Sequence, residues 1–344
     1  MNHLSENEKT VLYNLVKHPL FNNREISEKI GLKLSTVTAC RRRLKEKGYF
    51  FSRRVPIAHS IGCEIMCVAF SQFISSLSLD ERLKLGSKFD IQHPDVFWMM
   101  SEPSQGMTIQ FSKNYSDAKE RIKKVEEIYA EHKYLGNHGI TLLPFSFKLT
   151  NIINFFDYTF LLRHLFNIKD KKTISGFKGE KIKLSDAEKK AYYALIKYPE
   201  LSDKKLAEKI NSSRFTVSRM REKFEGKIMK TMNIPDMKKL GLKVVALIHM
   251  MFNLTTPSVT RKEIADNLLT QGAIFLSLEH VDILALIPFE NFDCYRVWMN
   301  SFSKKYREYD ILVEEPTILL FSVSESIFPK KHVYAPLVKK VLNI

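Results

Sequence analysis

The chain has 344 residues, which is long for a single hydrophobic core, so two or more domains are expected. Hydrophobic residues make up 44% of the chain, which is enough to build folded cores and excludes a wholly disordered protein. The formal net charge of +16 indicates a polyanionic partner, either nucleic acid or an anionic membrane surface.

The cysteines and the most apolar window indicate in which cellular compartment the protein is expected. The four cysteines show neither the paired spacing of a metal site nor the density of a disulfide-rich protein. The most apolar window, residues 151–166, contains Asp157 and Arg163 and is too short to cross a bilayer. We therefore expect a cytoplasmic protein without a membrane partner.

The chain contains an internal repeat. Residues 4–47 align without gaps on residues 184–227, and 15 of the 44 aligned positions are identical. The match resumes with VPIAHSIGCEIMCVAF (55–70) against IPDMKKLGLKVVALIH (234–249). Each half of the chain is therefore one copy of a unit of roughly 150 residues.

Each copy begins with a helical pattern. Ser5 and Glu8 have the spacing of a capping box at the start of a first helix, and Ser185 and Glu188 repeat it. A second helix is expected at 23–30, and a third at about 35–47 with Val37, Cys40 and Leu44 on its core face. The stretch YFFSRRVPI then predicts a β-hairpin wing. This order is typical of a winged helix-turn-helix, here expected at 1–60 and 181–239.

The rest of each copy has strand-like periods interrupted by two helices. The predicted order is βαββαβ, a ferredoxin-like topology, so the fold class is α+β with two winged helix-turn-helix and two ferredoxin-like domains. The ferredoxin-like domains are expected at 61–150 and 240–330. In the first copy we predict strands at 63–73, 96–101, 107–112 and 140–147 and helices at 78–89 and 116–134. In the second we predict strands at 242–252, 274–279, 282–288 and 312–322 and helices at 260–271 and 291–307.

Two segments lie outside these domains. Residues 151–180 are expected to form an apolar helix over 151–166 followed by a flexible basic linker. The helix either packs across the two halves, which we favour, or provides a docking surface for a protein such as the basal transcription machinery. Residues 331–344 are expected to be a C-terminal tail.

On these motifs the chain resembles the Lrp/AsnC (feast/famine) transcription regulators, duplicated in tandem. The residues that carry the resemblance are LSENEKTVLYNL, EISEKIGLKLSTVTACRRRL and VPIAHSIGCEIMCVAF in the first copy, with LAEKI, FTVSRMREKF and IPDMKKLGLKVVALI in the second. Members of that family dimerise through their βαββαβ sheets, so the resemblance implies an intramolecular pseudo-dimer. The resemblance does not decide whether two chains also form a homodimer.

The resemblance does not identify an effector. The family's small-molecule pocket is tied to a turn reading like G-x-Y-D, whereas the first copy has SEPSQGMT at this place. The second copy has LEHVDILAL and keeps only Asp282. Whether a small-molecule effector binds, and which one, therefore stays unknown.

An enzymatic alternative shares this architecture. The chain is similar in domain order to the sirohaem decarboxylases, which combine a degenerate helix-turn-helix with a ferredoxin-like module and hold a tetrapyrrole with His and Arg in the sheet. The corresponding strands here contain His93 in the first copy and His280 in the second, with no arginine on the strand. We rank this alternative second.

The distribution of charge favours nucleic acid over the enzymatic alternative. Residues 1–60 hold 12 basic and 5 acidic residues, and residues 181–240 hold 16 basic and 8 acidic residues. Fifteen of the 16 excess positive charges therefore lie in the two helix-turn-helix segments. Such a concentration is typical of a nucleic-acid footprint. We predict a sequence-specific regulator that binds double-stranded DNA and is not an enzyme.

The DNA contacts are expected at the third helix of each copy and at the first wing. Arg42 is the best candidate to read guanine, with Arg41 and Arg43 on phosphates. The predicted contacts are Ser35, Thr36, Thr38, Arg41, Arg42, Arg43, Arg53 and Arg54 in the first copy, and Arg214, Thr216, Ser218, Arg219 and Arg221 in the second. Because the two helices differ in sequence, we expect an imperfect palindrome with half-sites spaced by about 34 Å or a multiple of it.

Catalytic motifs are absent from the sequence. It contains no Gly-rich phosphate loop, HExxH, GxSxG or paired-carboxylate pattern. No catalytic residue, metal site or cofactor is therefore predicted.

Overall fold

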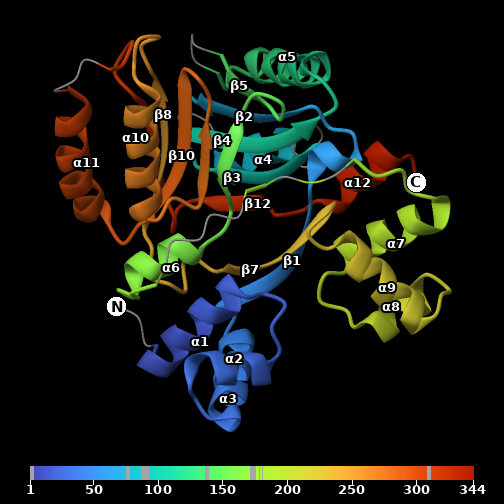
Figure 1. Cartoon of the computed structure of the whole chain (residues 1–344). Helices are drawn as coiled ribbons and strands as arrows, with labels where there is room; N and C mark the ends of the chain where they lie inside the picture. Colours follow the sequence, from blue (N-terminus) through green and yellow to red (C-terminus); the bar gives the residue numbers. More distant parts are fainter. Residues whose placement is uncertain are drawn as a thin grey trace. The chain divides into compact units, whose positions relative to one another are not determined.

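The computed structural model describes residues 4–74, 78–86, 93–135, 139–170, 176–177, 179, 181–307 and 311–344 (Figure 1). The chain divides into two compact units. Unit 1 contains residues 1–52, 150–177 and 232–324, and unit 2 contains residues 53–149, 178–231 and 325–344. Each unit thus combines the helix-turn-helix of one copy with the ferredoxin-like module of the other.

The helix-turn-helix of unit 1 consists of α1 (Glu6–Lys17), α2 (Asn23–Ile30) and α3 (Leu34–Glu46). The predicted capping box is present, with the Glu8 N–H donating to Ser5 Oγ at 3.3 Å and the Ser5 N–H donating to Glu8 Oε2 at 2.9 Å. The predicted core residues of these helices are buried; they are Val11, Leu12, Leu15, Val16, Val37, Cys40 and Leu44. The three predicted helices and their core residues are confirmed.

Unit 2 repeats this arrangement with α7 (Asp186–Lys197), α8 (Asp203–Lys209) and α9 (Arg214–Phe224). The capping box at Ser185 and Glu188 is also present. Val217 and Phe224 are buried on the inner side of α9.

The predicted local wing hairpin is wrong. β1 (Phe50–Pro56) pairs with β7 (Met229–Pro235) of the other copy in a two-stranded sheet. In unit 1 the Asp236 N–H donates to Tyr49 O at 2.9 Å, and in unit 2 the Ile57 N–H donates to Ile228 O at 2.8 Å. Each copy therefore supplies one strand, because the chain turns away before a second local strand forms.

The ferredoxin-like module of unit 2 has the predicted βαββαβ order. Its elements are β2 (Ile65–Gln72), α4 (Leu79–Gly86), β3 (Val96–Ser101), β4 (Gln105–Ser112), α5 (Tyr115–Glu131) and β5 (Thr141–Ser146), preceded by a short 3-10 helix, η1 (Ala58–Ile61). A fifth strand, β12 (Ile327–Lys331), extends the sheet to the order β12-β3-β4-β2-β5. The C-terminal helix α12 (Ala335–Leu342) belongs to the same unit.

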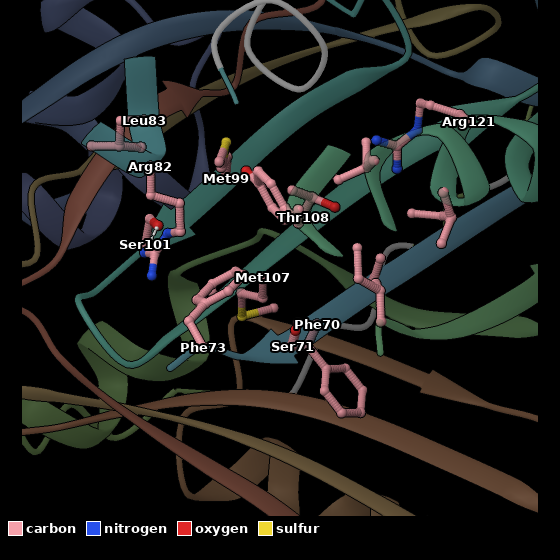
Figure 2. A pocket seen from close by; sticks show the side chains of 16 residues that line it. Phe70, Ser71, Phe73, Arg82, Leu83, Met99, Ser101, Met107, Thr108 and Arg121 are labelled. Carbon is pink, nitrogen blue, oxygen red and sulfur yellow. Dashed lines mark hydrogen bonds between the residues drawn. The ribbon is translucent and has the colours of Figure 1, made fainter. Parts of the chain in front are cut away.

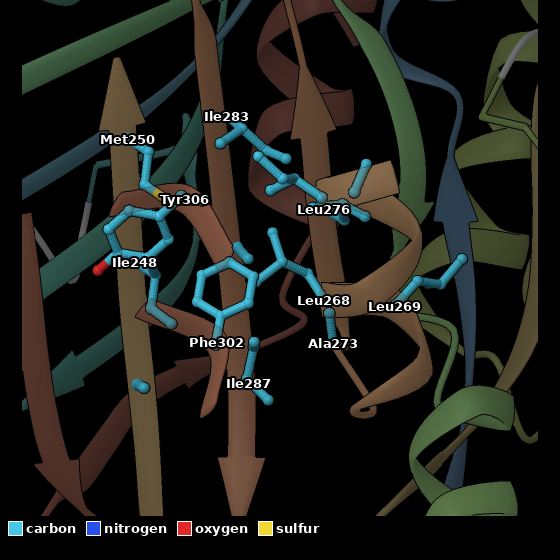
Figure 3. Close-up of a cluster of buried hydrophobic side chains, with 14 of the residues drawn as sticks. Ile248, Met250, Leu268, Leu269, Ala273, Leu276, Ile283, Ile287, Phe302 and Tyr306 are labelled. Atoms are coloured by element: carbon cyan, nitrogen blue, oxygen red, sulfur yellow. The ribbon is translucent and has the colours of Figure 1, made fainter. Parts of the chain in front are cut away.

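The module of unit 1 has the same order and an apolar core. Its elements are β8 (Val244–Met251), α10 (Ser258–Thr270), β9 (Phe275–Leu278), β10 (Asp282–Phe289), α11 (Phe292–Arg307) and β11 (Thr317–Ser322). Together with β6 (Asn151–Phe155) they form the sheet β11-β8-β10-β9-β6. Side chains of α10 and α11, among them Leu268 and Phe302, pack on Ile248 and Ile287 of the sheet (Figure 3).

The segments outside the predicted domains are more structured than expected. A single helix over 151–166 is wrong, because β6 pairs with β9 and Asn154 Nδ2 donates to Ala273 O at 2.7 Å. Only α6 (Thr159–Leu165) is helical. The expected C-terminal tail contains the end of β12 and all of α12. Of the predicted basic linker, residues 171–175, 178 and 180 lie outside the described residues, and the domain boundaries themselves stay a prediction.

Within the described ranges, no helix combines the length and the apolar character that a bilayer crossing requires. No group of three or more His, Cys, Asp or Glu side chains that could hold a metal ion occurs in the same part of the chain.

Gly179 occupies a narrow slot in unit 2. A Cβ at this position would clash with Lys227 O, a backbone atom that cannot turn aside, and would lie 2.5 Å from Ser60 Oγ and 2.8 Å from Ile57 Cγ2. We expect Gly179→Ala to lower the free energy of unfolding by about 1–3 kcal/mol, as overpacking does. The control is Gly176→Ala, whose Cβ would have nothing within 4 Å. Denaturant titration of the two variants measures the difference in their free energies of unfolding. Equal stabilities of the two variants would contradict it.

Candidate nucleic-acid interface

The outer face of α3 carries small polar and basic side chains. Ser35, Thr38, Arg42 and Lys45 are exposed and follow one another at helical spacings of three and four residues. Val37, Cys40 and Leu44 are buried on the opposite face. The Thr38 hydroxyl accepts a 3.2 Å hydrogen bond from Asn23 Nδ2 of α2. The helix therefore presents a hydrophilic stripe of the kind that enters a major groove.

The three consecutive arginines have different roles. Arg41 Nη1 donates to Phe21 O at 3.1 Å and to Asn23 Oδ1 at 3.0 Å, and burial lowers its pKa. Arg43 Nε lies 2.9 Å from Glu8 Oε1 of the capping box. The Arg42 side chain is 74% exposed, and its Nε lies 4.0 Å from Glu46 Oε1. Arg42 is thus the arginine of this run that is most available to a ligand.

The second copy has contacts equivalent to Arg41–Asn23 and Arg43–Glu8. Arg221 Nη2 lies 3.0 Å from Asp203 Oδ2, at the positions that align with Arg41 and Asn23. Lys223 forms an ion pair with Glu188, at the positions that align with Arg43 and Glu8. These pairs tie the third helix to the first two, so they are part of the scaffold in both copies.

The other predicted contacts of α9 divide into exposed and engaged side chains. Arg214 and Arg219 are exposed. Thr216 is half-buried, and its N–H donates to Ser213 Oγ at 3.1 Å. Ser218 Oγ donates to Glu222 Oε1 at 3.3 Å. Arg214 and Arg219 are therefore the predicted α9 residues best placed to meet a polyanion.

The helix starts also differ. Ser213 caps α9, whereas Lys33 precedes α3 without any side-chain cap. The exposed Ser35 and the half-buried Thr36 lie in the first turn of α3. Backbone N–H groups in an uncapped first turn are ready to bind a phosphate.

The wing arginines do not lie as predicted. Arg54 is buried, and its Nη1 donates to Leu195 O at 3.2 Å, so it has an internal role in place of the expected DNA contact. Arg53 is half-buried, and burial lowers the pKa of both guanidinium groups. Both residues lie on β1, whose pairing with β7 takes the place of a protruding hairpin.

Glu8 links the capping box of α1 to α3 through its ion pair with Arg43. Burial raises the pKa of its carboxyl, but hydrogen bonds from Ser5 and the charge of Arg43 outweigh burial, so the net pKa is lowered. Its contribution to stability is therefore present above the unfolded-state pKa and lost as the pH falls through the folded-state pKa.

We expect Glu8→Gln to reduce the free energy of unfolding by about 1–2 kcal/mol at pH 7, because a charge-assisted pair is lost. The difference from wild type is expected to be smaller at pH 3, because the fraction of protonated carboxyl rises as the pH falls and protonation removes the ion pair. Denaturant titrations at both pH values check this. Glu6→Gln, which alters an exposed i,i+3 pair with Lys9, is the matched control. A deficit that stays the same at both pH values would argue against the ion pair.

A second candidate site lies between the sheet and the helices of unit 2. The cross-strand pairs of β2 and β4 are Cys67–Gln110, Ala69–Thr108 and Ser71–Gly106, where β8 and β10 have Ala246–Ile287, Ile248–Ala285 and Met250–Ile283. The helix-facing side of this sheet is therefore small and polar, whereas its counterpart in unit 1 is apolar. The Gln110 amide is buried opposite the Cys67 thiol, with which it forms a hydrogen bond, and Ser112 Oγ is buried without a partner among the described residues.

A cavity of about 40 Å³ lies between this sheet and the helices, lined by polar side chains such as Thr108 and Arg121 together with apolar ones such as Phe73 and Ile122. Figure 2 shows Arg82 of α4 and Arg121 of α5 on either side of Met99 and Thr108. Arg82 Nη2 donates to Ser101 Oγ at 2.8 Å, and burial lowers its pKa to about 10. The cavity has room for a few water molecules.

The two histidines of the enzymatic alternative lie in different units. His93 in unit 2 is half-buried and accepts the Asp95 N–H at 3.3 Å, and burial together with nearby cations, Arg121 first, lowers its pKa to about 3. His280 in unit 1 is exposed, and its Nδ1 lies 3.2 Å from Arg261 Nη1 of α10. The imidazole of His93 is thus neutral at physiological pH.

Sequence reasoning missed two features of the ferredoxin-like modules. No arginine lies on their described strands, but Arg82 and Arg261 come from helices and contact the β3–β4 and β9–β10 turns. Extending the repeat alignment beyond residue 70 would have paired them. The other feature is the pair His249 and Asp282, with Nε2 and Oδ1 2.9 Å apart on adjacent strands.

Comparison with known proteins gives a local and a full-length match. A family model described as winged helix-turn-helix DNA-binding matches residues 4–50. The crystal structure of the siroheme decarboxylase NirDL is 10% identical, with a TM-score of 0.53, and the match covers 98% of this chain and 99% of that chain. Its complex with an iron-uroporphyrin III analogue gives a TM-score of 0.54 with the same identity and coverage.

A shorter protein matches part of the chain. LrpC of B. subtilis is 16% identical, with a TM-score of 0.31 and coverage of 41% of this chain and 92% of that chain. No curated protein sequence matches this chain significantly.

The prediction that the chain is not an enzyme is overturned by the full-length matches, because an enzyme has the same fold over the whole chain. At 10% identity these matches show the fold. Residues 4–50 of the chain thus match a winged helix-turn-helix DNA-binding model, and over its full length the chain has a fold in which a winged helix-turn-helix with a ferredoxin-like module is repeated in tandem.

Proposed function

We propose that the protein is a transcription regulator that binds double-stranded DNA with α3 and α9 as its two recognition helices. The observation that carries this proposal is that each helix buries its apolar side chains and leaves basic ones exposed on the outer face, Arg42 on α3 and Arg214 and Arg219 on α9. Together the two helix-turn-helix segments hold nearly all the excess positive charge of the chain.

The contacts between the second and third helices of each copy support this role. Arg41 with Asn23 and Arg221 with Asp203 fix the third helix against the second, so its outer face is held rigid. Rigid presentation lowers the entropic cost of ordering side chains on a ligand. Because Arg42 aligns with Glu222, the two helices have different outer faces, and we propose an operator with two unlike half-sites.

Selection of bound fragments from randomised and genomic DNA tests the proposal. The enriched sequences are expected to contain two related but unequal half-sites. A wild-type protein that enriches no sequence and binds no duplex at low salt would refute it.

A second candidate function is a decarboxylase acting on a tetrapyrrole, and the full-length fold match to siroheme decarboxylase favours it. In this case His93, with its neutral imidazole, and the His249–Asp282 pair are the residues to examine. Incubation of the purified protein with sirohaem under anaerobic conditions, followed by mass analysis of the tetrapyrrole, tests it. Loss of carboxyl groups from sirohaem would support the second candidate, and unchanged sirohaem would count against it.

A further inference from the structure

Phe215 is the most exposed large hydrophobic side chain in the described part of the chain. It is 87% exposed, compared with 79% for Leu149 and 75% for Leu254. It occupies the second position of α9. Exposure of a phenylalanine to this degree leaves most of its apolar surface in water, and covering that surface with a partner would be favourable.

The local structure holds Phe215 in place. Ser213 caps the helix through the Thr216 N–H, and the Ser213 and Thr216 hydroxyls lie 2.8 Å apart, so the first turn of α9 is fixed on both sides of Phe215. Val217 and Phe224 point into the core. Residues 215, 218, 219 and 222 follow at helical spacing on the outer side.

The surroundings of Phe215 indicate a polyanionic partner. Its neighbours Arg214 and Arg219 are exposed cations on the same helix. Cations beside an isolated aromatic ring are unfavourable for an apolar protein surface, but they suit a DNA groove, where phosphates line the edges and an apolar group lies on the floor. In the major groove that apolar group is the C5-methyl of thymine.

We propose that Phe215 is a specificity-determining residue that packs on the C5-methyl group of a thymine in the half-site bound by α9. This inference rests on the proposed DNA-binding function and adds the base that α9 reads.

The internal repeat provides the contrast. Position 215 aligns with Ser35 of α3, a small exposed hydroxyl that has no comparable apolar surface. The apolar residue in the first turn of α3 is Leu34, one position earlier and 48% exposed. A thymine required by Phe215 is therefore not expected at the symmetric position of the other half-site.

Methyl deletion on the DNA tests the proposal. The duplex recovered by selection is titrated with the full-length protein by fluorescence anisotropy, and each thymine of the half-site bound by α9 is replaced in turn by deoxyuridine, which lacks only the C5-methyl. Wild type is expected to lose about four-fold in affinity at one position, as removal of one buried methyl predicts. Phe215→Ser is expected to lose about as much or more on the thymine duplex and to bind both duplexes equally.

Two variants serve as controls. Leu149→Ser removes a similarly exposed apolar side chain from unit 2 outside the helix-turn-helix and is expected to behave as wild type. Phe215→Leu keeps an apolar side chain and is expected to retain part of the deoxyuridine effect, which a folding defect would not do. Equal sensitivity of wild type and Phe215→Ser to deoxyuridine, or insensitivity of wild type at every thymine, would overturn the proposal. Failure of wild type to bind any duplex would instead refute the proposed function.

Discussion

Arg42→Ala is expected to weaken binding to the selected operator by about 10- to 100-fold, because a bidentate contact to guanine contributes roughly 1–3 kcal/mol of discrimination. Arg41 and Arg43 are held by Asn23 and Glu8, whereas the Arg42 side chain is 74% exposed. The loss is expected on the operator and to be much smaller on a scrambled duplex of the same length. Anisotropy titrations on both duplexes measure it.

Arg296→Ala is the matched control for this prediction. Arg296 is a similarly exposed arginine of unit 1, paired with Asp293 on α11 in the ferredoxin-like module. It is expected to bind both duplexes as wild type does. If Arg42→Ala and Arg296→Ala bind the operator equally well, α3 does not read it through Arg42.

Raising the salt concentration from 50 to 200 mM is expected to reduce affinity by about three to five orders of magnitude, the range for a protein that makes 6–10 phosphate contacts. The reason is the concentration of excess charge in the two helix-turn-helix segments, each of which neutralises phosphates and releases counterions. The slope of log affinity against log salt concentration measures the number of contacts.

Lys33→Ala provides a graded test of the same prediction. Lys33 is exposed at the N-cap of α3, beside the uncapped first turn. Its removal is expected to reduce the magnitude of the salt slope by about one and to affect all sequences alike. An affinity that does not depend on salt would mean that the charged segments do not contact phosphates.

The two ferredoxin-like modules differ in the side chains that lie between the sheet and the helices. The helix-facing side of the unit 1 sheet is filled by residues such as Ile287 and Phe302, so it is a plain hydrophobic core. In unit 2 the same layer contains Gln110 and Arg121 and a small cavity. Burial of polar groups is costly, so this layer of unit 2 is expected to stabilise its module less than the apolar layer of unit 1 does.

Helix caps, buried helix faces and the order of elements were predictable from the sequence by itself. The capping boxes at Ser5 and Ser185, the buried faces of the first and third helices and the βαββαβ order follow from side-chain spacing over a few residues. Short-range propensity and hydrophobic period determine such features, and the internal repeat allowed each one to be read twice.

Features that depend on distant partners were decided only by the tertiary structure. The pairing of β1 with β7, the addition of β6 and β12 to sheets of the other copy, and the burial of Arg54 depend on contacts far apart in sequence. The difference in role between Arg42 and its two neighbours depends on the positions of Glu8, which binds Arg43, and Asn23, which binds Arg41. The sequence predicted that Arg42 differs in role from Arg41 and Arg43, but only the fold shows that the other two are bound inside the domain, because the partners that bind them belong to other segments of the chain.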